Sequence, residues 1–359
     1  MVVAVVLVLR QLVDKARAGV AWGLRDDDFW AFSGGHLRRG LLGEILYRGT
    51  DLVGERWLAV VSAGLVVIYG FAVWRVARIM QREASWRWLW PVGLSAVFLN
   101  FPVDREAALL LPLLMVGSWT ESGALRRVAF LLAVIAAAFV HEFAVLLYLP
   151  LVLMLLAEEP PGPQRHLLLA GAGAIVLTGG LIAVLRPVPS IVLETTFWPT
   201  HGMPGLEATH LYSFVSRSLG DTMRLHFSML ATPSGLWNLA FQATLLALLV
   251  SCLWGSWRML AAVLCFVLPA SVLTIDYGRY AYMTFFFYFL AWYQLGFARK
   301  SRVPSPRHRR LICSVAVLFC LIPHSFFAGA EPVELAVERS AKRVWGAMPK
   351  LARLARIGS

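Results

Sequence analysis

Hydrophobic residues in this chain come in long blocks rather than in the short alternations of a half-buried sheet. Beyond residue 56 there are ten such blocks. Each predicts a helix, because only a backbone that hydrogen-bonds within itself is stable in lipid. The blocks cover residues 57–74, 88–101, 107–118, 128–139, 143–157, 167–186, 236–254, 259–274, 280–297 and 311–328. The pattern predicts an all-α fold, a polytopic integral membrane helical bundle with about 10–11 hydrophobic segments and additional interfacial amphipathic helices.

Four of the blocks between residues 88 and 157 are shorter than the roughly 20 residues that a full membrane span needs. They predict tilted, broken or half-buried helices packed as tight hairpins. One alternative stays open for part of this region. Residues 128–157 could equally form one long helix with His141 and Glu142 inside it.

The two ends of the chain differ in character from the middle. The first nine residues are apolar but too few to cross a bilayer, and Arg10 follows them. They predict either the second half of a first membrane helix or an interfacial helix. The sequence therefore divides into four parts. Residues 1–24 form a partial first membrane helix or an interfacial helix, and residues 25–56 form an outer-face loop with an interfacial helix. Residues 57–328 form a transmembrane bundle with a long outer-face loop at 187–235, and residues 329–359 form a basic amphipathic tail.

Composition supports the membrane interpretation and changes the meaning of the charge. The chain is 59% hydrophobic and 15% charged, with a mean hydropathy of +0.68; soluble domains carry about 25% charged residues. A net charge of +12 would suggest nucleic acid as the partner of a soluble protein. Cytoplasmic loops of membrane proteins are rich in Lys and Arg, so no nucleic-acid partner is expected here. The four cysteines lie in apolar runs and predict neither disulfides nor a zinc site.

Clusters of arginine and lysine give the orientation. The loops 75–87 and 298–310 are strongly basic, and Arg126, Arg127 and Arg258 fall in two further alternate loops. Placing these loops in the cytoplasm puts residues 20–56, 102–106, 140–142, 187–235 and 275–279 on the opposite face. With the alanine- and arginine-rich composition of a GC-rich bacterial genome, this predicts a multi-pass protein of the bacterial inner membrane with its site on the periplasmic or extracellular face.

Polar groups that could carry chemistry all fall on that outer face. Charged residues at membrane helix ends are costly and usually face a polar cavity. The groups are Asp26, Asp27 and Asp28 with His36, Arg38 and Arg39; Asp104, Arg105 and Glu106; His141 and Glu142; Glu194, His201, His210, Arg217, Asp221, Arg224 and His226; and Asp276 with Arg279.

Each group also has a simpler interpretation. Asp104 with Arg105, and Asp276 with Arg279, could be ion pairs that secure short turns. The three aspartates could form a solvated loop, and Arg38 and Arg39 could contact lipid headgroups. The histidines of the long loop are too irregularly spaced to argue for a metal.

Taken together, the groups suit transfer from a lipid-linked phosphate donor. Arginines would hold the phosphate with planar, charge-assisted hydrogen bonds. A carboxylate would take a proton from an acceptor hydroxyl, and arginine or histidine would stabilise the leaving phosphate. The expected catalytic residues are Asp27, Asp28, His141 and Glu142, and the expected substrate-binding residues are Arg38, Arg39, Asp104, Arg105, Asp276 and Arg279. No cofactor is expected, and nothing beyond its charge supports a divalent metal at the acidic loop.

The early acidic stretch "RDDDFW", the interfacial stretch after it and the short helix pairs make the chain resemble the GT-C class of membrane glycosyltransferases. It also resembles the polytopic polymerases and ligases of bacterial surface polysaccharides. The GT-C resemblance implies that the catalytic base is Asp27 or Asp28. The polymerase resemblance implies that Arg105, His141 and Arg279 contact the donor phosphate.

The function expected on these grounds is that of a membrane glycosyltransferase or polysaccharide polymerase with a polyprenyl-phosphate-linked donor. Its partners would be the lipid-linked sugar donor, the glycan acceptor and membrane lipids, while protein partners stay unassigned. Two alternatives remain open. A lipid-linked-sugar transporter or flippase would need a polar path across the bundle, and a non-catalytic assembly partner would have its polar groups satisfied as isolated ion pairs.

Overall fold

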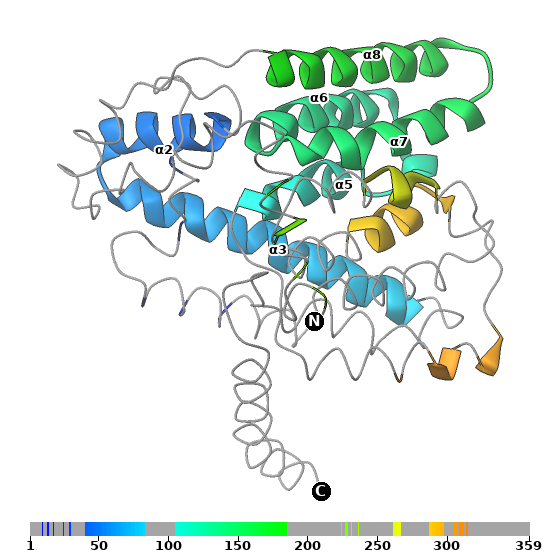
Figure 1. Cartoon of the computed structure of the whole chain (residues 1–359), viewed down its shortest axis with the longest axis horizontal. Coiled ribbons are helices and arrows are strands. Elements are labelled where there is room, and N and C mark those ends of the chain that lie inside the picture. Colours follow the sequence, from blue (N-terminus) through cyan, green and yellow to red (C-terminus); the bar gives the residue numbers. More distant parts are fainter. Residues whose placement is uncertain are drawn as a thin grey trace, which may run out of the picture.

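The computed structural model describes residues 40–82, 105–184, 261–266 and 287–297, together with single residues and short pieces between 9 and 29, 224 and 236, and 305 and 314. Within these ranges the chain is helical and contains no strand. The all-α expectation is therefore confirmed for the part of the chain that the structure describes. Figure 1 shows the longest described helices packed together as one group.

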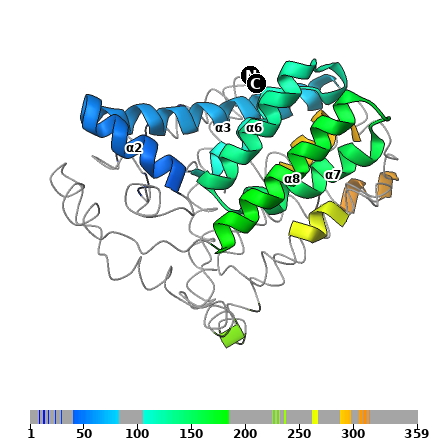
Figure 2. The ribbon, with the colours of Figure 1, turned by 90° about the horizontal axis from the view of Figure 1, so that it is seen from above.

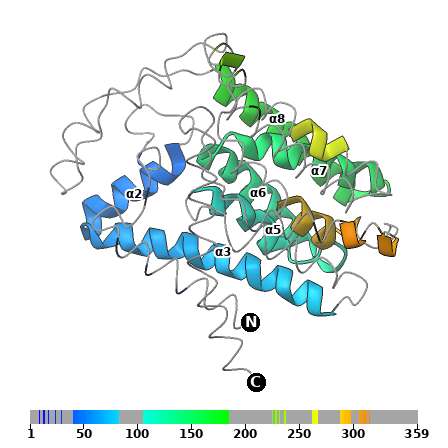
Figure 3. The ribbon, with the colours of Figure 1, turned by 60° about the horizontal axis from the view of Figure 1, so that its bottom comes forward.

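The first described pair of helices is a hairpin. Helix α2, Gly40–Val53, leads into the long helix α3, Arg56–Arg82, through a turn at Gly54. Gly54 has φ +85°, a left-handed conformation that glycine adopts at little cost, and its N–H donates to the Thr50 carbonyl oxygen at 2.8 Å. The two helices diverge from this turn as a V (Figure 3).

One side of α2 is buried against α3 and against α6, Ala124–Val140. The buried residues are Gly40, Leu42, Gly43, Leu46 and Thr50. On the other side, Arg48 Nε donates to Glu44 Oε1 at 2.9 Å, and this hydrogen bond raises the pKa of the exposed Arg48 guanidinium. The helix expected to follow Arg38 and Arg39 is thus present. The glycines at positions 40 and 43 lie on its packed face, as close helix packing requires.

The hairpin is closed by an indole. Trp57 Nε1 donates to the Ile45 carbonyl oxygen at 2.9 Å, so the Trp57 ring lies across Gly49. A Cβ added at Gly49 would overlap that ring, whereas one added at Gly64 would meet nothing within 4 Å. The absence of a side chain at Gly49 is what lets the indole reach α2.

Gly49→Ala is therefore expected to lower the free energy of unfolding by about 1–3 kcal/mol, because the indole must move and give up its hydrogen bond. Gly64→Ala, at an exposed helix position with nothing within 4 Å of the added Cβ, is the control and is expected to be neutral or slightly stabilising. Thermal unfolding of the detergent-solubilised variants measures both. Equal stability of the two variants would show that the indole does not close the hairpin.

Helix α3 corrects one expectation. A loop was expected from residue 75, but α3 continues to Arg82. Arg75 and Arg78 do not end the helix, because their long side chains reach partners from within it. Arg75 Nη2 donates to the Gly117 carbonyl oxygen at 3.1 Å, and the Arg78 guanidinium lies 5.8 Å from the Trp74 ring of the same helix.

The central helices follow as a compact group. The 3-10 helix η5, Arg105–Leu110, continues into α5, Leu111–Val116, and a short 3-10 turn η6, Trp119–Glu121, leads to α6, Ala124–Val140. Helix α7, Phe143–Glu158, returns from the end of α6, and α8, Pro163–Val184, packs on both. Figure 2 shows α6, α7 and α8 as neighbouring bands with aligned axes. A second expectation is corrected here, since Arg126 and Arg127 lie in the first turn of α6 rather than in a loop.

The alternative left open for residues 128–157 is decided by a break at His141. His141 is extended, with φ −156° and ψ 122°, while its N–H still donates to Ala137 and its carbonyl oxygen accepts from Ala144. Glu142, the residue directly before α7, already has a helical backbone conformation. Residues 124–158 are therefore two helices joined by a two-residue connection.

The other expected segments agree where they are described. Residues 107–118 coincide closely with the η5–α5 pair, residues 57–74 lie within the longer α3, and the described part of 167–186 lies within α8. Helical residues also occur at 261–266 and 287–294. Apart from single residues, the segments 88–101, 236–254 and 311–328, the long loop 187–235 and the two terminal regions lie outside the described residues. Two described helices are long and apolar enough to cross a membrane, Arg56–Ile79 and Pro163–Ala183.

Candidate functional site

Four ionisable side chains meet where η5 approaches the break between α6 and α7. Glu106 Oε1 lies 3.8 Å from Arg105 Nε and 3.8 Å from His141 Nε2. On the other side of the imidazole, Glu142 Oε2 lies 3.6 Å from His141 Nδ1. The side chains of Glu106 and His141 are fully buried and that of Arg105 is 3% exposed, while that of Glu142 is 16% exposed. We call these four residues the buried cluster.

The break in the helix hairpin holds the imidazole in place. The Phe143 backbone N–H donates to His141 Nδ1 at 3.2 Å. This N–H belongs to the first turn of α7, where backbone donors have no partner within the helix. The Phe143 ring also lies 4.9 Å from the imidazole. The histidine that interrupts the apolar stretch therefore caps the helix that follows it.

The 3-10 turn that carries Glu106 is held by a separate hydrogen bond. Tyr148 lies on α7 and donates its hydroxyl to the Leu109 carbonyl oxygen, in η5, at 2.6 Å. Both groups are buried, so this bond fixes the 3-10 turn that carries Arg105 and Glu106 against the helix that follows His141. The buried cluster thus spans two elements that are packed together, rather than one mobile loop.

Aromatic rings pack against Phe143 and Tyr148, the two residues of α7 that hold the site together. Phe143 packs edge-on to Phe266 at 5.7 Å, and Tyr148 packs edge-on to Phe287 at 4.9 Å. Phe266 and Phe287 come from the two short described pieces late in the chain, so distant parts of the sequence contribute to the surroundings of the cluster. Ionised groups are strongly disfavoured in such apolar surroundings unless paired, and Arg105 and Glu106 lie next to each other as one such pair.

The chemical capacity of the buried cluster follows from its groups. It holds one guanidinium, one imidazole and two carboxylates, arranged as a row in which each group lies within 4 Å of the next. A guanidinium can grip a phosphate or carboxylate with parallel hydrogen bonds, and a carboxylate beside an imidazole can accept and return a proton. Among the described residues, no group of three His, Cys, Asp or Glu side chains is arranged to hold a metal ion.

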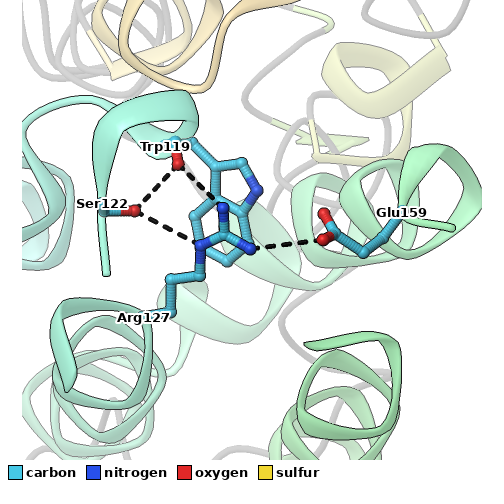
Figure 4. A network of polar contacts seen from close by, with 4 residues as sticks. All are labelled: Trp119, Ser122, Arg127 and Glu159. Carbon is cyan, nitrogen blue, oxygen red and sulfur yellow. Dashed lines mark hydrogen bonds and ion pairs between the residues drawn. The ribbon is translucent and has the colours of Figure 1, made fainter. Parts of the chain in front are cut away.

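The opposite end of α6 carries a second polar group, which we call the Arg127 clamp (Figure 4). Arg127 donates from Nη2 to the Trp119 carbonyl oxygen at 3.2 Å and from Nη1 to Glu159 Oε1 at 3.3 Å. Its guanidinium lies 4.6 Å from the Trp119 ring, and its Nε lies 3.4 Å from Ser122 Oγ. The Arg127 clamp therefore ties the start of α6 to the end of α7.

A further contact lies at the same end as the Arg127 clamp. The side-chain amide of buried Gln294 bridges two elements when its nitrogen faces Leu113. In that orientation the nitrogen donates to the Leu113 carbonyl oxygen at 2.7 Å, and the amide oxygen accepts from Arg75 Nε at 3.2 Å. Arg75 also bonds Gly117, just before Trp119. The arginines of this end are thus used as structural anchors.

The two polar ends are separated by an apolar layer. At 1.5 Å per residue, the stretch of α6 from Arg127 to His141 is about 21 Å long. The path from Gly117 back to Arg105 through α5 and η5 also comes to about 21 Å. Buried residues of α6 between the two ends are apolar: Phe130, Leu131, Val134, Ala137, Ala138 and Val140.

Three of the expected site residues are described, and the structure brings them together. They are Arg105, His141 and Glu142. The expected residues Asp27, Asp28, Arg38, Arg39, Asp104, Asp276 and Arg279 lie outside the described residues. Phe29, which directly follows the three aspartates, is buried in the core.

Glu106 was named among the polar groups of the outer face but not among the expected catalytic or substrate-binding residues, although it stands in the same "DRE" group as Arg105. Two signals pointed to it. A carboxylate at the start of an apolar block is costly, and the predicted topology put residues 102–106 and 140–142 on one face. No spacing in the sequence distinguishes it from Asp104.

Comparison with known proteins adds no family. No protein-family model, no curated protein and no solved structure matches this chain.

Proposed function

We propose that this chain is a membrane glycosyltransferase or polysaccharide polymerase that uses a polyprenyl-phosphate-linked sugar donor. The observation that carries the proposal is the burial of Arg105, Glu106 and His141 together at one end of a hairpin of short apolar helices. Paired charges buried in apolar helices are usually retained for function. A guanidinium beside a proton-accepting pair is what transfer from a phosphate donor to a hydroxyl requires.

The depth of the cluster favours a lipid-linked substrate. The two polar ends are about 21 Å apart, whereas the hydrocarbon core of a bilayer is about 30 Å thick. With the Arg127 clamp at one membrane surface, the buried cluster lies several ångströms inside the other. A phosphate anchored by a polyprenyl chain reaches that depth from within the leaflet.

In this proposal the site faces the outer side of the bacterial inner membrane. Basic side chains gather at the end of the hairpin that holds the Arg127 clamp, and positive residues favour the cytoplasm. The buried cluster belongs to the other end. In this proposal the chain is a multi-pass bundle of about 10–11 segments, and the expected groups Asp27, Asp28, Arg38, Arg39, Asp276 and Arg279 join the cluster from the outer side.

The test is transfer by the chain reconstituted in liposomes with radiolabelled polyprenyl-phosphate sugars. Arg105→Ala is expected to lower kcat/KM for the donor by about 100-fold or more, mainly through KM, because the phosphate loses its guanidinium. Arg105→Lys keeps the charge that balances Glu106 and is expected to lose less. Arg126→Ala, exposed at the other end, is the control. Absence of transfer from every lipid-linked donor tested would refute the proposal.

One observation favours a second candidate, a lipid-linked-sugar transporter. Transport sites are often built at breaks in membrane helices, and the cluster lies at such a break between α6 and α7. Movement of a labelled lipid-linked sugar between leaflets, without any transfer of the sugar, would favour this candidate.

A further inference from the structure

The hydrogen bond at the start of α7 determines where His141 carries its proton. Phe143 N–H points at Nδ1 from 3.2 Å, so Nδ1 must offer a lone pair. A neutral imidazole then has its proton on Nε2, an assignment that rests on the hydrogen-bond partners. Nε2 is the atom that faces Glu106 Oε1. The imidazole therefore accepts from α7, and its Nε2–H is directed toward Glu106 Oε1 across 3.8 Å, a separation longer than a hydrogen bond of the kind that tightens in an enzyme–substrate complex.

This arrangement leaves the imidazole poorly suited to accept a further proton. A proton added at Nδ1 would remove the acceptor for Phe143 N–H and leave a buried backbone donor at the end of a helix, which costs about 1–3 kcal/mol. Neither of the two carboxylate contacts, Glu142 Oε2 to Nδ1 at 3.6 Å and Glu106 Oε1 to Nε2 at 3.8 Å, is as short as a hydrogen bond, so the Phe143 N–H is the contact that fixes the tautomer. Glu106 has no such constraint, because a carboxylate is an acceptor on both oxygens.

We infer that Glu106 is the proton acceptor of the site and that His141, as the neutral Nε2–H form, is the residue that positions it. This inference rests on the proposed function. The acceptor hydroxyl gives its proton to a Glu106 oxygen, and the electron pair of the broken O–H bond forms the new bond to the anomeric carbon of the donor sugar. The bond from that carbon to the phosphate oxygen breaks, and the lipid phosphate leaves with its electron pair. Arg105 stays beside the Glu106 carboxylate throughout.

Two substitutions at one position separate this role from helix capping. Asparagine is a good cap, so His141→Asn retains an acceptor for Phe143 N–H but has no donor that reaches Glu106. Glutamine places an amide N–H near the position of Nε2, so His141→Gln retains the donor toward Glu106. If His141 only caps α7, the asparagine variant is the active one.

If His141 positions Glu106, the glutamine variant is instead the active one. His141→Asn is expected to fold normally and to lose transfer by about 100-fold or more, the scale of a proton-transfer contribution. His141→Gln is expected to remain within about tenfold of the unaltered chain. An asparagine variant as active as the unaltered chain would overturn the inference.

A spectroscopic measurement tests the same inference without activity. In the full-length chain labelled with 15N-histidine in lipid, the His141 resonances are identified among the eight histidines by their loss in His141→Gln. We expect a protonated Nε2, an unprotonated Nδ1, and a shift of the Nε2–H resonance in Glu106→Gln. A proton on Nδ1, or no response to Glu106→Gln, would overturn the inference. If the spectrum is as expected but no donor supports transfer, the proposed function fails and the pairing of His141 with Glu106 stands.

Discussion

Replacing Glu106 with glutamine is expected to reduce transfer from a lipid-linked donor by about 100- to 10,000-fold, the contribution of a positioned general base. Glutamine has nearly the same volume and keeps one acceptor oxygen, but it cannot take up a proton. Because Arg105 loses its ion-pair partner, some loss of stability accompanies the change. The measurement is initial transfer rate in liposomes at equal amounts of folded protein.

Two comparisons make this result specific. Glu121→Gln, exposed at the opposite end of the hairpin, is expected to leave the rate unchanged. Asp27→Asn and Asp28→Asn test the base that the GT-C resemblance implies. An active Glu106→Gln variant together with an inactive aspartate variant would give the base role to the acidic loop instead.

Replacing Arg127 with alanine is expected to cause a large loss of stability, about 3 kcal/mol. The change removes the bonds to Trp119, Ser122 and Glu159 together, and leaves the mostly buried Glu159 carboxylate without its charge partner in the Arg127 clamp. It also removes the cation–π contact with the Trp119 ring. Thermal unfolding in detergent measures the loss.

Neighbouring Arg126 is exposed and offers a matched control for the same chemical change. Arg126→Ala is expected to alter the free energy of unfolding by less than about 0.5 kcal/mol. Arg127→Lys keeps the charge but cannot reproduce the planar fork, so it is expected to fall between the two. An Arg127→Ala variant as stable as Arg126→Ala would show that the Arg127 clamp does not hold the hairpin.

Much of the described fold could be predicted from apolar runs alone, because membrane-length hydrophobic blocks have few alternatives to helix. Helix ends were harder to predict. Arginine at residues 75 and 126 suggested loops, yet long side chains can reach a carbonyl or a ring from within a helix. Two expected loops are helical for that reason.

The candidate site could likewise be predicted only in part. The common face of Arg105 and His141 followed from the predicted topology, since their segments connect to the same side of the bundle. The pairing of His141 with Glu106 could not be predicted, because it depends on the 3-10 turn that directs the Glu106 side chain. Arg127 and Glu159 are 32 residues apart, beyond any local pattern, but they lie at similar distances from the His141–Glu142 connection and meet because the hairpin is antiparallel.

The central claim is that the buried cluster binds a polyprenyl phosphate at one end of the hairpin. Photo-crosslinking tests it most directly, with a polyprenyl phosphate that carries a diazirine near the phosphate and mass spectrometry to locate the label. We expect labelling of η5 and of the connection between α6 and α7, suppressed by unlabelled polyprenyl phosphate and reduced in Arg105→Ala. Labelling confined to the Arg127 clamp, or labelling that unlabelled lipid does not suppress, would contradict the account.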